Sequence, residues 1–552
     1  MKKQRLALTL LTTGLTLTAG AVLLATRHAR KSRRRLVRRL ARNEEYSGAI
    51  PERLAARCTN GTFIGKRHNG VLAFKGIPYA QQPVGALRWK APLAPYPDQR
   101  AFEAYYFGPS PIQTQRKQER ASYYRQSEAC LYLNVWTKAA KDERNLSELP
   151  KKRPVMVFIH GGSYAWGGTS NPLYDGHNLV AAHPDVVLVT VGYRLGVMGF
   201  VDFSSVPGGD EYPDAPNLGL LDQVEALRWI QENIAAFGGD PRCVTLFGES
   251  AGGGSVSMLA AMPVAKGLFH RVIAQSGSIA LSYDKDECQA FTRRLLSRSH
   301  CTSMAELRAL PTRELRRINR WITLFNAFPQ RDGRHLPIDL YEAYRRGDTA
   351  QYDLLIGTNE DEARYWQLEV GGYWVYRFML PVLYRRSCEV LTREDRHRLQ
   401  IFLARLPMEE VWRKTEFYNE ILFRLPAIAQ AENHVRAGGR AFMYRWTFPS
   451  SIPRLRACHA VELAYVFGNL DIRQFTGERV NVTLARDVQQ MWVNFAKTGD
   501  PSLPHQPWPP YTPDLRHTLR LDSKMEIESD PRAEARQLLS SLLKYRFGNV
   551  KW

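Results

Sequence analysis

Ser250 is the residue whose surroundings first indicate chemistry. It stands in the stretch Leu-Phe-Gly-Glu-Ser-Ala-Gly-Gly-Gly, residues 246–254, after a short apolar and partly β-branched run. Residues 243–247 predict a buried strand, and residues 251–262 predict a helix. A serine at such a junction lies on a tight, strained turn, and glycines at positions 248 and 252 let the neighbouring backbone pass without a Cβ clash. The hydroxyl could then act as a nucleophile, but a lone Gly-x-Ser-x-Gly motif is more often an ordinary loop.

Alternating helix and strand patterns surround this serine. Before it, apolar residues recur at steps of three and four from Leu220 to Ile234 and stop at a Gly-Gly pair followed by Pro241. This pattern is typical of a helix and its end. The alternation predicts an α/β fold with a doubly wound, mostly parallel sheet. The other strand-like runs are residues 155–159, 186–193, 271–277, 353–359 and 441–448.

A β-hairpin is predicted near the start of this region. Asn69-Gly70 lies between two strand-like runs, residues 61–65 and 71–74. Asn-Gly between two such runs is the strongest short hairpin signal, because both residues adopt positive φ readily.

The motif and its surroundings resemble a known family. The block from Asp222-Gln223 through residues 234–241 to Gly252 is similar to the type-B carboxylesterases, which include bacterial esterases, cholinesterases and some lipases. The likeness extends from about residue 60 to about residue 522. The resemblance implies an α/β-hydrolase fold, with helical insertions forming the pocket wall. It also implies a serine hydrolase that cleaves carboxylic esters through an acyl-enzyme intermediate to an alcohol and a carboxylate.

The same resemblance selects an acid and a base. Three acids, Glu360, Asp361 and Glu362, crowd together after the strand-like run 353–359, and composition cannot choose between them. The family pattern places its catalytic acid at the last position, so we expect Glu362, with Asp361 second. Of thirteen histidines, His459 stands in a stretch that resembles the family's histidine loop. The order serine, glutamate, histidine is that of α/β-hydrolases.

An oxyanion hole is predicted from backbone N–H groups. Glycines directly after a strand free N–H groups to point at a ligand, which a developing oxyanion requires. By resemblance the donors are Gly162 and Ser163, and Ala251 supplies a third N–H. His160, in the same loop, is expected to shape the loop and not to act as the base.

Two structural salt bridges follow from the resemblance. The family pairs an arginine at the place of Arg88 with a glutamate at the place of Glu128. It likewise pairs the residues at the places of Arg194 and Asp222. Residues 363–440, rich in aromatics and helical in pattern, lie between the predicted acid and base and are expected to form the pocket wall.

Other functional classes have weaker support. A catalytically silent adhesion or scaffold protein on the same fold is the alternative, but such relatives typically lose the serine or the histidine. No metal or organic cofactor is expected, because no His/Cys cluster shows ligand spacing. By resemblance, cholinesterases carry a tryptophan that stacks on choline in the stretch that matches residues 110–128. This stretch contains no tryptophan, so cholinesterase activity is not supported. The expected partner is a small-molecule ester, with no specific nucleic acid.

The formal net charge of +22 is concentrated in a tail. The first 43 residues carry twelve Lys and Arg and no Asp or Glu. Residues 6–26 are uncharged and as a helix would be about 31 Å long, enough to span a bilayer. We therefore expect a transmembrane anchor over residues 1–43 and a hydrolase domain over residues 44–552. The alternatives are a cleaved signal peptide and a basic tail lying on anionic lipid or nucleic acid.

Membrane orientation and redox compartment are predicted together. More basic residues follow the uncharged run than precede it, which favours a cytoplasm-facing domain; export after signal-peptide cleavage is the alternative. The seven cysteines form no disulfide framework by spacing. By resemblance, Cys130 and Cys301 lack the partners that secreted relatives carry, which favours a reducing compartment.

Overall fold

The computed structural model describes residues 42–113, 125–138, 153–319 and 327–545. By its internal contacts the chain divides after Asn43, and residues 44–552 form the unit described below. The predicted N-terminal span, residues 6–26, lies outside the described residues. Within the described ranges, no helix combines the length and the apolar character needed to cross a bilayer.

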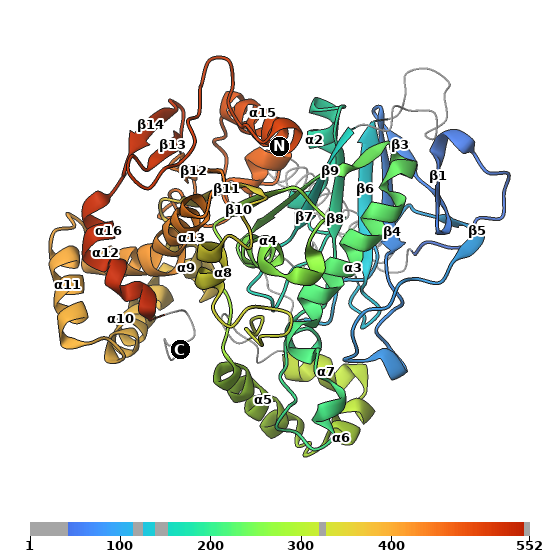
Figure 1. Cartoon of the computed structure of the whole chain (residues 1–552), viewed down its shortest axis with the longest axis horizontal. Helices are drawn as coiled ribbons and strands as arrows, with labels where there is room; N and C mark the ends of the chain where they lie inside the picture. The colour runs from blue at the N-terminus through green and yellow to red at the C-terminus, as the bar shows by residue number, and fades with distance from the viewer. Residues whose placement is uncertain (1–41, 114–124, 139–152, 320–326, 546–552) are drawn as a thin grey trace, which may run out of the picture. The chain divides into compact units, whose positions relative to one another are not determined.

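An eleven-stranded sheet runs through this unit, as Figure 1 shows. Its strand order is β14-β13-β12-β11-β10-β9-β7-β8-β6-β4-β3. From β13 to β8 in this order neighbouring strands are parallel, whereas both edges are antiparallel. The strands of the described residues are β1 (Ala55–Cys58), β2 (Asn60–Ile64), β3 (Lys66–His68), β4 (Val71–Pro78), β5 (Asp98–Glu103), β6 (Tyr132–Lys138), β7 (Arg153–Ile159), β8 (Val187–Val191), β9 (Gly239–Glu249), β10 (Arg271–Gln275), β11 (Asp353–Asn359), β12 (Ala441–Trp446), β13 (His517–Leu521) and β14 (Glu526–Ser529).

The hairpin forms at Asn69-Gly70, but one of its predicted strands was wrong. Both turn residues have positive φ, 44° and 77°, as a two-residue type I′ turn requires. The strand before the turn is β3, not the run 61–65. A two-residue turn pairs the residues directly beside it, here His68 with Val71. Most of the predicted run forms β2, which pairs with β1 and β5 in a separate three-stranded sheet.

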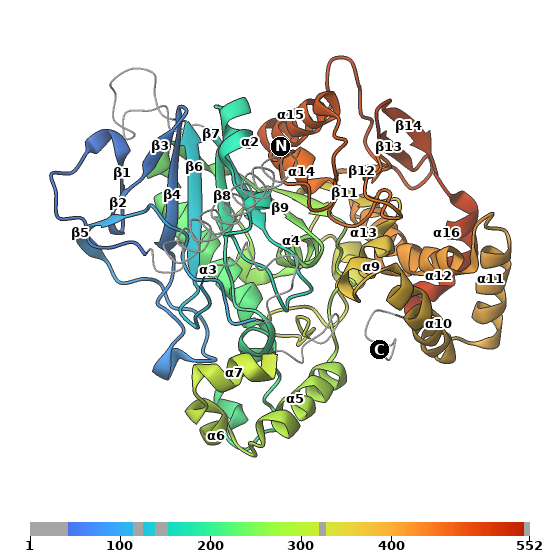
Figure 2. The ribbon, with the colours of Figure 1, turned by 180° about the vertical axis from the view of Figure 1, so that it is seen from behind.

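Helices cover both faces of the large sheet (Figures 1 and 2). One core contains apolar side chains of α3, α4 and α13, and the other contains those of α2, α14 and α15. Strands covered on both faces read as continuous apolar runs, and all five residues of β8 are buried. The helices are α2 (His177–Ala182), α3 (Leu218–Asn233), α4 (Ala251–Ala261), α5 (Lys285–Ser299), α6 (Met304–Ala309), α7 (Thr312–Asn319), α8 (Leu340–Arg346), α9 (Trp366–Glu369), α10 (Tyr373–Glu389), α11 (Arg393–Ala404), α12 (Glu410–Asn419), α13 (Leu425–Arg436), α14 (Leu463–Phe467), α15 (Val482–Thr498) and α16 (Ala533–Leu539).

The carboxyl ends of the central strands meet at one edge of the sheet. Ile159, the last residue of β7, pairs with Gly248 near the end of β9. The last residue of β10, Gln275, lies between β9 and β11, paired with Glu249 and with Gly357. The loops that follow these strands carry the predicted oxyanion donors, Ser250 and the predicted acid. In open α/β sheets this edge is where ligands bind.

Arg194, which follows β8, forms a buried ion pair with Asp222 of α3. The guanidinium donates to both carboxylate oxygens, with Nε at 2.8 Å and Nη2 at 2.6 Å. The two side chains are 1% and 0% exposed. Arg88 and Glu128 are likewise paired through two contacts of 2.6 Å.

Asp222→Asn should destabilise the fold by about 3–5 kcal/mol, because it leaves the Arg194 guanidinium buried without a counter-charge. The urea midpoint of unfolding measures this loss. Asp240→Asn is the matched control, since Arg242, its partner, is 82% exposed and such pairs contribute about 0–1 kcal/mol. Equal midpoints for the two variants would contradict the prediction.

Candidate active site

Ser250 lies on a strained turn between β9 and α4. Its backbone has φ 58° and ψ −121°, a conformation that L-residues rarely adopt. The turn is fixed by two hydrogen bonds: Ser250 N–H donates to Gln275 O at 2.8 Å, and Gly254 N–H donates to Ser250 O at 2.9 Å. A Cβ at position 252 would lie 1.9 Å from Ile159 O, so only glycine fits there. The turn therefore has the geometry predicted from the sequence motif.

Glu362, and not Asp361, faces His459. The Nδ1–H of His459 donates to Glu362 Oε2 at 2.5 Å, and both residues are buried. The other carboxylate oxygen, Oε1, accepts from the N–H of Asn359 at 2.7 Å. Asp361 instead pairs with Arg364 at 2.8 Å. One acid of the three is thus in contact with the imidazole.

Asn359 joins the acid loop to the histidine loop. Its Nδ2 donates to Cys458 O at 2.9 Å and to Glu462 Oε2 at 2.6 Å. Its N–H holds Glu362, so one residue contacts both loops. The predicted acid and base are therefore fixed relative to each other by the backbone as well as by their own hydrogen bond.

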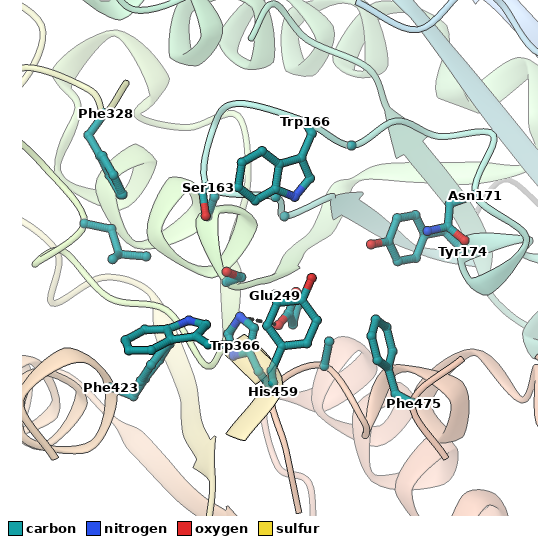
Figure 3. Close-up of a pocket in the computed structure, with 18 residues that line it drawn as sticks. Ser163, Trp166, Asn171, Tyr174, Glu249, Phe328, Trp366, Phe423, His459 and Phe475 are labelled. Atoms are coloured by element: carbon teal, nitrogen blue, oxygen red, sulfur yellow. Dashed lines mark ion pairs between the residues drawn. The ribbon is translucent and has the colours of Figure 1, made fainter. Parts of the chain in front are cut away.

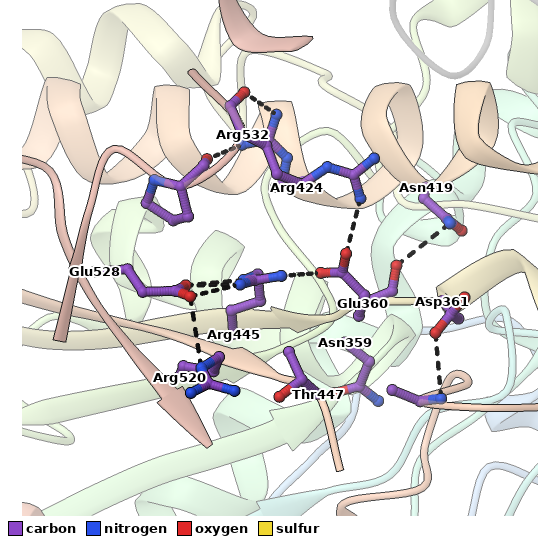
Figure 4. Close-up of polar contacts among 12 residues, drawn as sticks. Asn359, Glu360, Asp361, Asn419, Arg424, Arg445, Thr447, Arg520, Glu528 and Arg532 are labelled. Carbon is purple, nitrogen blue, oxygen red and sulfur yellow. Dashed lines mark hydrogen bonds and ion pairs between the residues drawn. The ribbon is translucent and has the colours of Figure 1, made fainter. Parts of the chain in front are cut away.

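Glu360 anchors the acid loop from the opposite side (Figure 4). Its carboxylate accepts from Arg445 and lies 3.2 Å from the guanidinium of Arg532. Arg445 also donates to Glu528 on β14 at 2.7 Å. Burial alone would raise the pKa of Glu360, but Arg532 and Arg445 hold it below its usual value. The three crowded acids thus have three different partners.

The free nitrogen of His459 faces a second carboxylate (Figure 3). Nε2 lies 3.0 Å from Glu249 Oε1. Among the described contacts no hydrogen bond joins His459 to the hydroxyl of Ser250. Burial lowers the pKa of His459, but Glu249 and Glu362 more than offset this and raise it to about 9. Burial, with Glu462 and Glu362 nearby, raises the pKa of Glu249 to about 8 despite the imidazole beside it.

The predicted oxyanion donors lie around Ser250. Gly162 has φ 115° and Ser163 has φ 53°, in the loop after β7. Within the described part of the chain, no hydrogen bond is formed by the N–H of either residue. Ala251 is the first residue of α4, where a helix leaves its N–H without an internal partner. All three residues line the same pocket as Ser250.

His160, in the same loop, is placed for packing. Its ring stacks on Tyr193, and its Nδ1 contacts Gly161 O at 2.8 Å. Complete burial lowers its pKa to about 4. It does not line the pocket.

The pocket above Ser250 has an apolar end and a more polar end. It encloses about 780 Å³, counting its open mouth. In Figure 3, Phe328, Trp366 and Phe423 lie on one side of His459, and Asn171 and Tyr174 lie on the other. Phe423 belongs to a π-helical turn, Glu420–Arg424, between α12 and α13. Such turns are rare and often occur at functional sites.

Comparison with known proteins identifies the family. Residues 53–539 match the family model described as the Carboxylesterase family. The chain belongs to this family. It is 39% identical over 508 residues to the para-nitrobenzyl esterase of Bacillus subtilis, covering 87% of this chain and 97% of that one. It is 33% identical over 503 residues to carboxylesterase 5A of Felis catus, covering 82% and 86%.

A solved structure agrees with this assignment. A crystal structure of a Geobacillus stearothermophilus carboxylesterase matches with a TM-score of 0.77 and 34% identity, over 88% of this chain and all of that one. The predicted α/β-hydrolase fold is thereby confirmed. This carboxylesterase hydrolyses carboxylic esters, and nothing in the comparisons supports the scaffold alternative.

Sequence reasoning missed several residues around the imidazole of this carboxylesterase. Glu249 lies inside the serine motif and Glu462 three residues after the histidine, so a charged residue in an otherwise apolar context was the available signal. For Phe328 and Phe475 there was no signal, because aromatics are usually core residues. The 363–440 region does contribute pocket wall, through Tyr365, Trp366 and Phe423.

All seven cysteines are free, and four of them are buried. Cys130 and Cys301 are both among the buried ones. Within the described residues no group of His, Cys, Asp and Glu has the arrangement of a metal site.

Proposed function

We propose that this carboxylesterase acts through a triad of Ser250, His459 and Glu362. The observation that carries the proposal is the His459–Glu362 hydrogen bond of 2.5 Å in the pocket that contains the strained Ser250 turn. His459 Nε2 takes the proton of the Ser250 hydroxyl as its oxygen attacks the ester carbonyl. Glu362 holds the Nδ1–H and stabilises the imidazolium. The imidazolium then gives its proton to the leaving alcohol.

The second half of the cycle uses the same groups. Water enters after the alcohol has left, His459 removes one of its protons, and the resulting hydroxide attacks the acyl-enzyme carbonyl. The ester bond to Ser250 breaks, the serine oxygen recovers a proton from His459, and the carboxylic acid departs and loses its proton to water. In both halves the tetrahedral oxyanion accepts hydrogen bonds from the N–H groups of Gly162, Ser163 and Ala251. Losing one such donor costs about 3–4 kcal/mol.

His459 must leave Glu249 before it can act as a base. In the free enzyme its Nε2 faces Glu249, and the raised pKa favours the protonated ring. Catalytic hydrogen bonds are often long in unliganded enzymes and tighten when substrate binds. We propose that substrate binding turns the imidazole away from the Glu249 carboxylate and toward Ser250, and that the ring then gives its extra proton to solvent.

Glu249→Gln should move the acidic limb of the kcat/KM profile to lower pH. His459 must be neutral to act as a base, so the acidic limb follows its pKa. Removing the Glu249 carboxylate lowers that pKa, because the imidazolium loses a neighbouring negative charge. A neighbouring charge at this distance shifts a pKa by about 1–3 units, so the limb should move by about that much. The profile from pH 5 to pH 10 on p-nitrophenyl butyrate measures the shift. A limb that stays in place, or moves to higher pH, would show that Glu249 does not set the proton affinity of His459.

The substrates proposed are uncharged esters with an apolar or aromatic group. Phe328, Trp366 and Phe423 line the pocket that contains the reacting serine and offer that group aromatic contacts. The relative from Bacillus subtilis is named for an aromatic ester. Hydrolysis of p-nitrophenyl esters from acetate to long acyl chains, and of p-nitrobenzyl acetate, tests this range. Preference for a cationic choline ester would contradict it.

We also propose that residues 1–43 attach the enzyme to a membrane and that residues 44–552 are the hydrolase domain. The support is the uncharged run with basic residues on both sides. The larger basic group after the run favours a domain facing the cytoplasm. Fractionation of cells that make the full chain, with N-terminal sequencing, tests this. An intact chain in the membrane fraction supports it, and an exported chain that starts after residue 21 contradicts it.

A further inference from the structure

Helix α10 has an exposed apolar face. Phe378 is 78% exposed and Trp374 is 66% exposed. These two side chains and Val382 follow each other at steps of four, and Val375 and Met379 lie beside them. Residues at this spacing share one side of a helix. Large apolar side chains gathered in this way on a surface usually mark a place where something binds.

The opposite side of α10 is already fully packed. Tyr376 and Leu380 are buried, and the Tyr376 hydroxyl is 2.9 Å from Thr415 Oγ1 on α12. Further along, the Ser387 hydroxyl is 2.9 Å from the Tyr418 hydroxyl, also on α12. The helix is therefore held on the domain by its inner side. Among the described residues, no element covers its apolar outer face.

Basic side chains surround the apolar face. Arg377, Arg385 and Arg386 are exposed on the same helix, and one acidic residue, Glu389, lies at its C-terminal end. Arg377 is 3.8 Å from Glu409. In the described part of the chain neither Arg385 nor Arg386 has an ion-pair partner. Helices that lie in the surface of an anionic bilayer typically carry tryptophan and phenylalanine on one face, with basic residues beside them. The exposed side of α10 has this composition.

We propose that this face of α10 docks on an anionic lipid surface. Trp374, Phe378 and Val382 enter the boundary between headgroups and acyl chains, and Arg385 and Arg386 bind lipid phosphates. A second copy of the chain fits the face less well, because both copies would bring an excess of positive charge to the contact. Residues 44–552 keep +10 of the net charge of +22, which favours a negatively charged partner over a like one.

Helix α10 follows closely in the chain after a residue that lines the pocket, so docking through α10 would bear on access to substrate. Trp366, which lines the pocket, lies eight residues before Trp374 in the chain. The two glycines between them, Gly371 and Gly372, have φ 99° and 121°, and a Cβ at either position would meet no atom within 4 Å. Uncharged apolar esters concentrate in lipid, so docking here would hold the enzyme at the phase that contains its proposed substrates. The inference goes beyond ester hydrolysis itself and does not depend on the triad.

Fluorescence quenching by bromine-labelled phosphatidylglycerol vesicles tests the docking with the full chain. Residues 1–43 contain no tryptophan, so their own membrane binding gives no signal. The parent should lose roughly one twelfth of its emission, the share of Trp374 among twelve tryptophans. Trp374→Phe should abolish this loss, and Phe378→Trp should double it. Val482→Trp, which adds a tryptophan at an exposed apolar position on α15, is the matched control and should add none.

A second set of measurements tests the contribution of the arginines to docking. Each basic residue near an anionic surface strengthens partitioning by about fivefold, so Arg385→Glu with Arg386→Glu should reduce the quenching strongly, as should zwitterionic vesicles. Every variant should keep the parent rate on dissolved p-nitrophenyl acetate. Equal quenching in parent and Trp374→Phe would overturn the proposal, and so would equal quenching by zwitterionic and anionic vesicles. A dimer that Trp374→Ser dissociates would assign the face to a second copy instead.

Discussion

Ser250→Ala should lower kcat for p-nitrophenyl butyrate by about 10⁵–10⁶-fold. The hydroxyl oxygen forms the bond to the acyl group, and alanine has no atom that can replace it. The oxyanion donors and the pocket remain, so a rate above that of water alone should survive. Initial rates on highly purified variant measure the loss. A phosphonate ester that labels the parent with one equivalent should leave the variant unlabelled by mass.

Ser276→Ala is the matched control for this experiment. Ser276 follows β10, the strand next to β9, and also has a positive φ, 48°. Its hydroxyl is buried and does not line the pocket. This variant should keep kcat within a few fold of the parent and should still accept the phosphonate. If Ser250→Ala kept its activity, or if both variants lost it, Ser250 would not be the nucleophile.

Glu362→Gln should lower kcat by about 10⁴-fold. A glutamine has almost the same shape, but it removes the negative charge that stabilises the imidazolium and can present its amide donor to Nδ1. His459 would then favour the wrong tautomer. The urea midpoint of unfolding should fall only slightly, because the N–H of Asn359 still donates to the remaining side-chain oxygen. The comparison of kcat with the midpoint separates a catalytic effect from unfolding.

Asp361→Asn distinguishes the neighbouring acid. Asp361 pairs with Arg364 and accepts from the N–H of Ala457 at 3.4 Å, away from the imidazole. Its loss should lower stability by about 3–5 kcal/mol, as for other buried pairs, while kcat of the folded enzyme stays near that of the parent. A large fall in kcat for Asp361→Asn with a small one for Glu362→Gln would reverse the assignment of the acid.

The serine turn could be predicted from sequence because its constraints are local. Ser250, Gly248 and Gly252 lie within five residues of each other, and the close approach of Ile159 O to residue 252 leaves room for glycine alone. The acid was different. Glu360, Asp361 and Glu362 are equivalent as a pattern, and only the resemblance to a family separated them. Glu360 and Glu362 are distinguished by distant partners, Arg445 on β12 and Arg532 for the first and His459 for the second, which no local pattern reveals.

Contacts set by packing could not be predicted either. The approach of Glu249 to His459 depends on the end of β9 and the histidine loop, which are far apart in the chain. Phe423 reaches the pocket through a π-helical turn, which has no sequence signature that we could apply. The hairpin strand was misplaced for a simpler reason: the apolar run 61–65 satisfied the strand pattern, but the tight turn at Asn69-Gly70 pairs only its immediate neighbours.

The parallel arrangement of β9, β10, β11 and β12 has a consequence for folding. Glu362 and His459 are 97 residues apart in the chain, and parallel strands can be joined only through long crossovers. Contacts of this kind form slowly, because much of the chain must be ordered before they are made. During refolding from urea, helical circular dichroism should therefore return first. Esterase activity should return with the last strands of the sheet and so report the rate at which that assembly is completed.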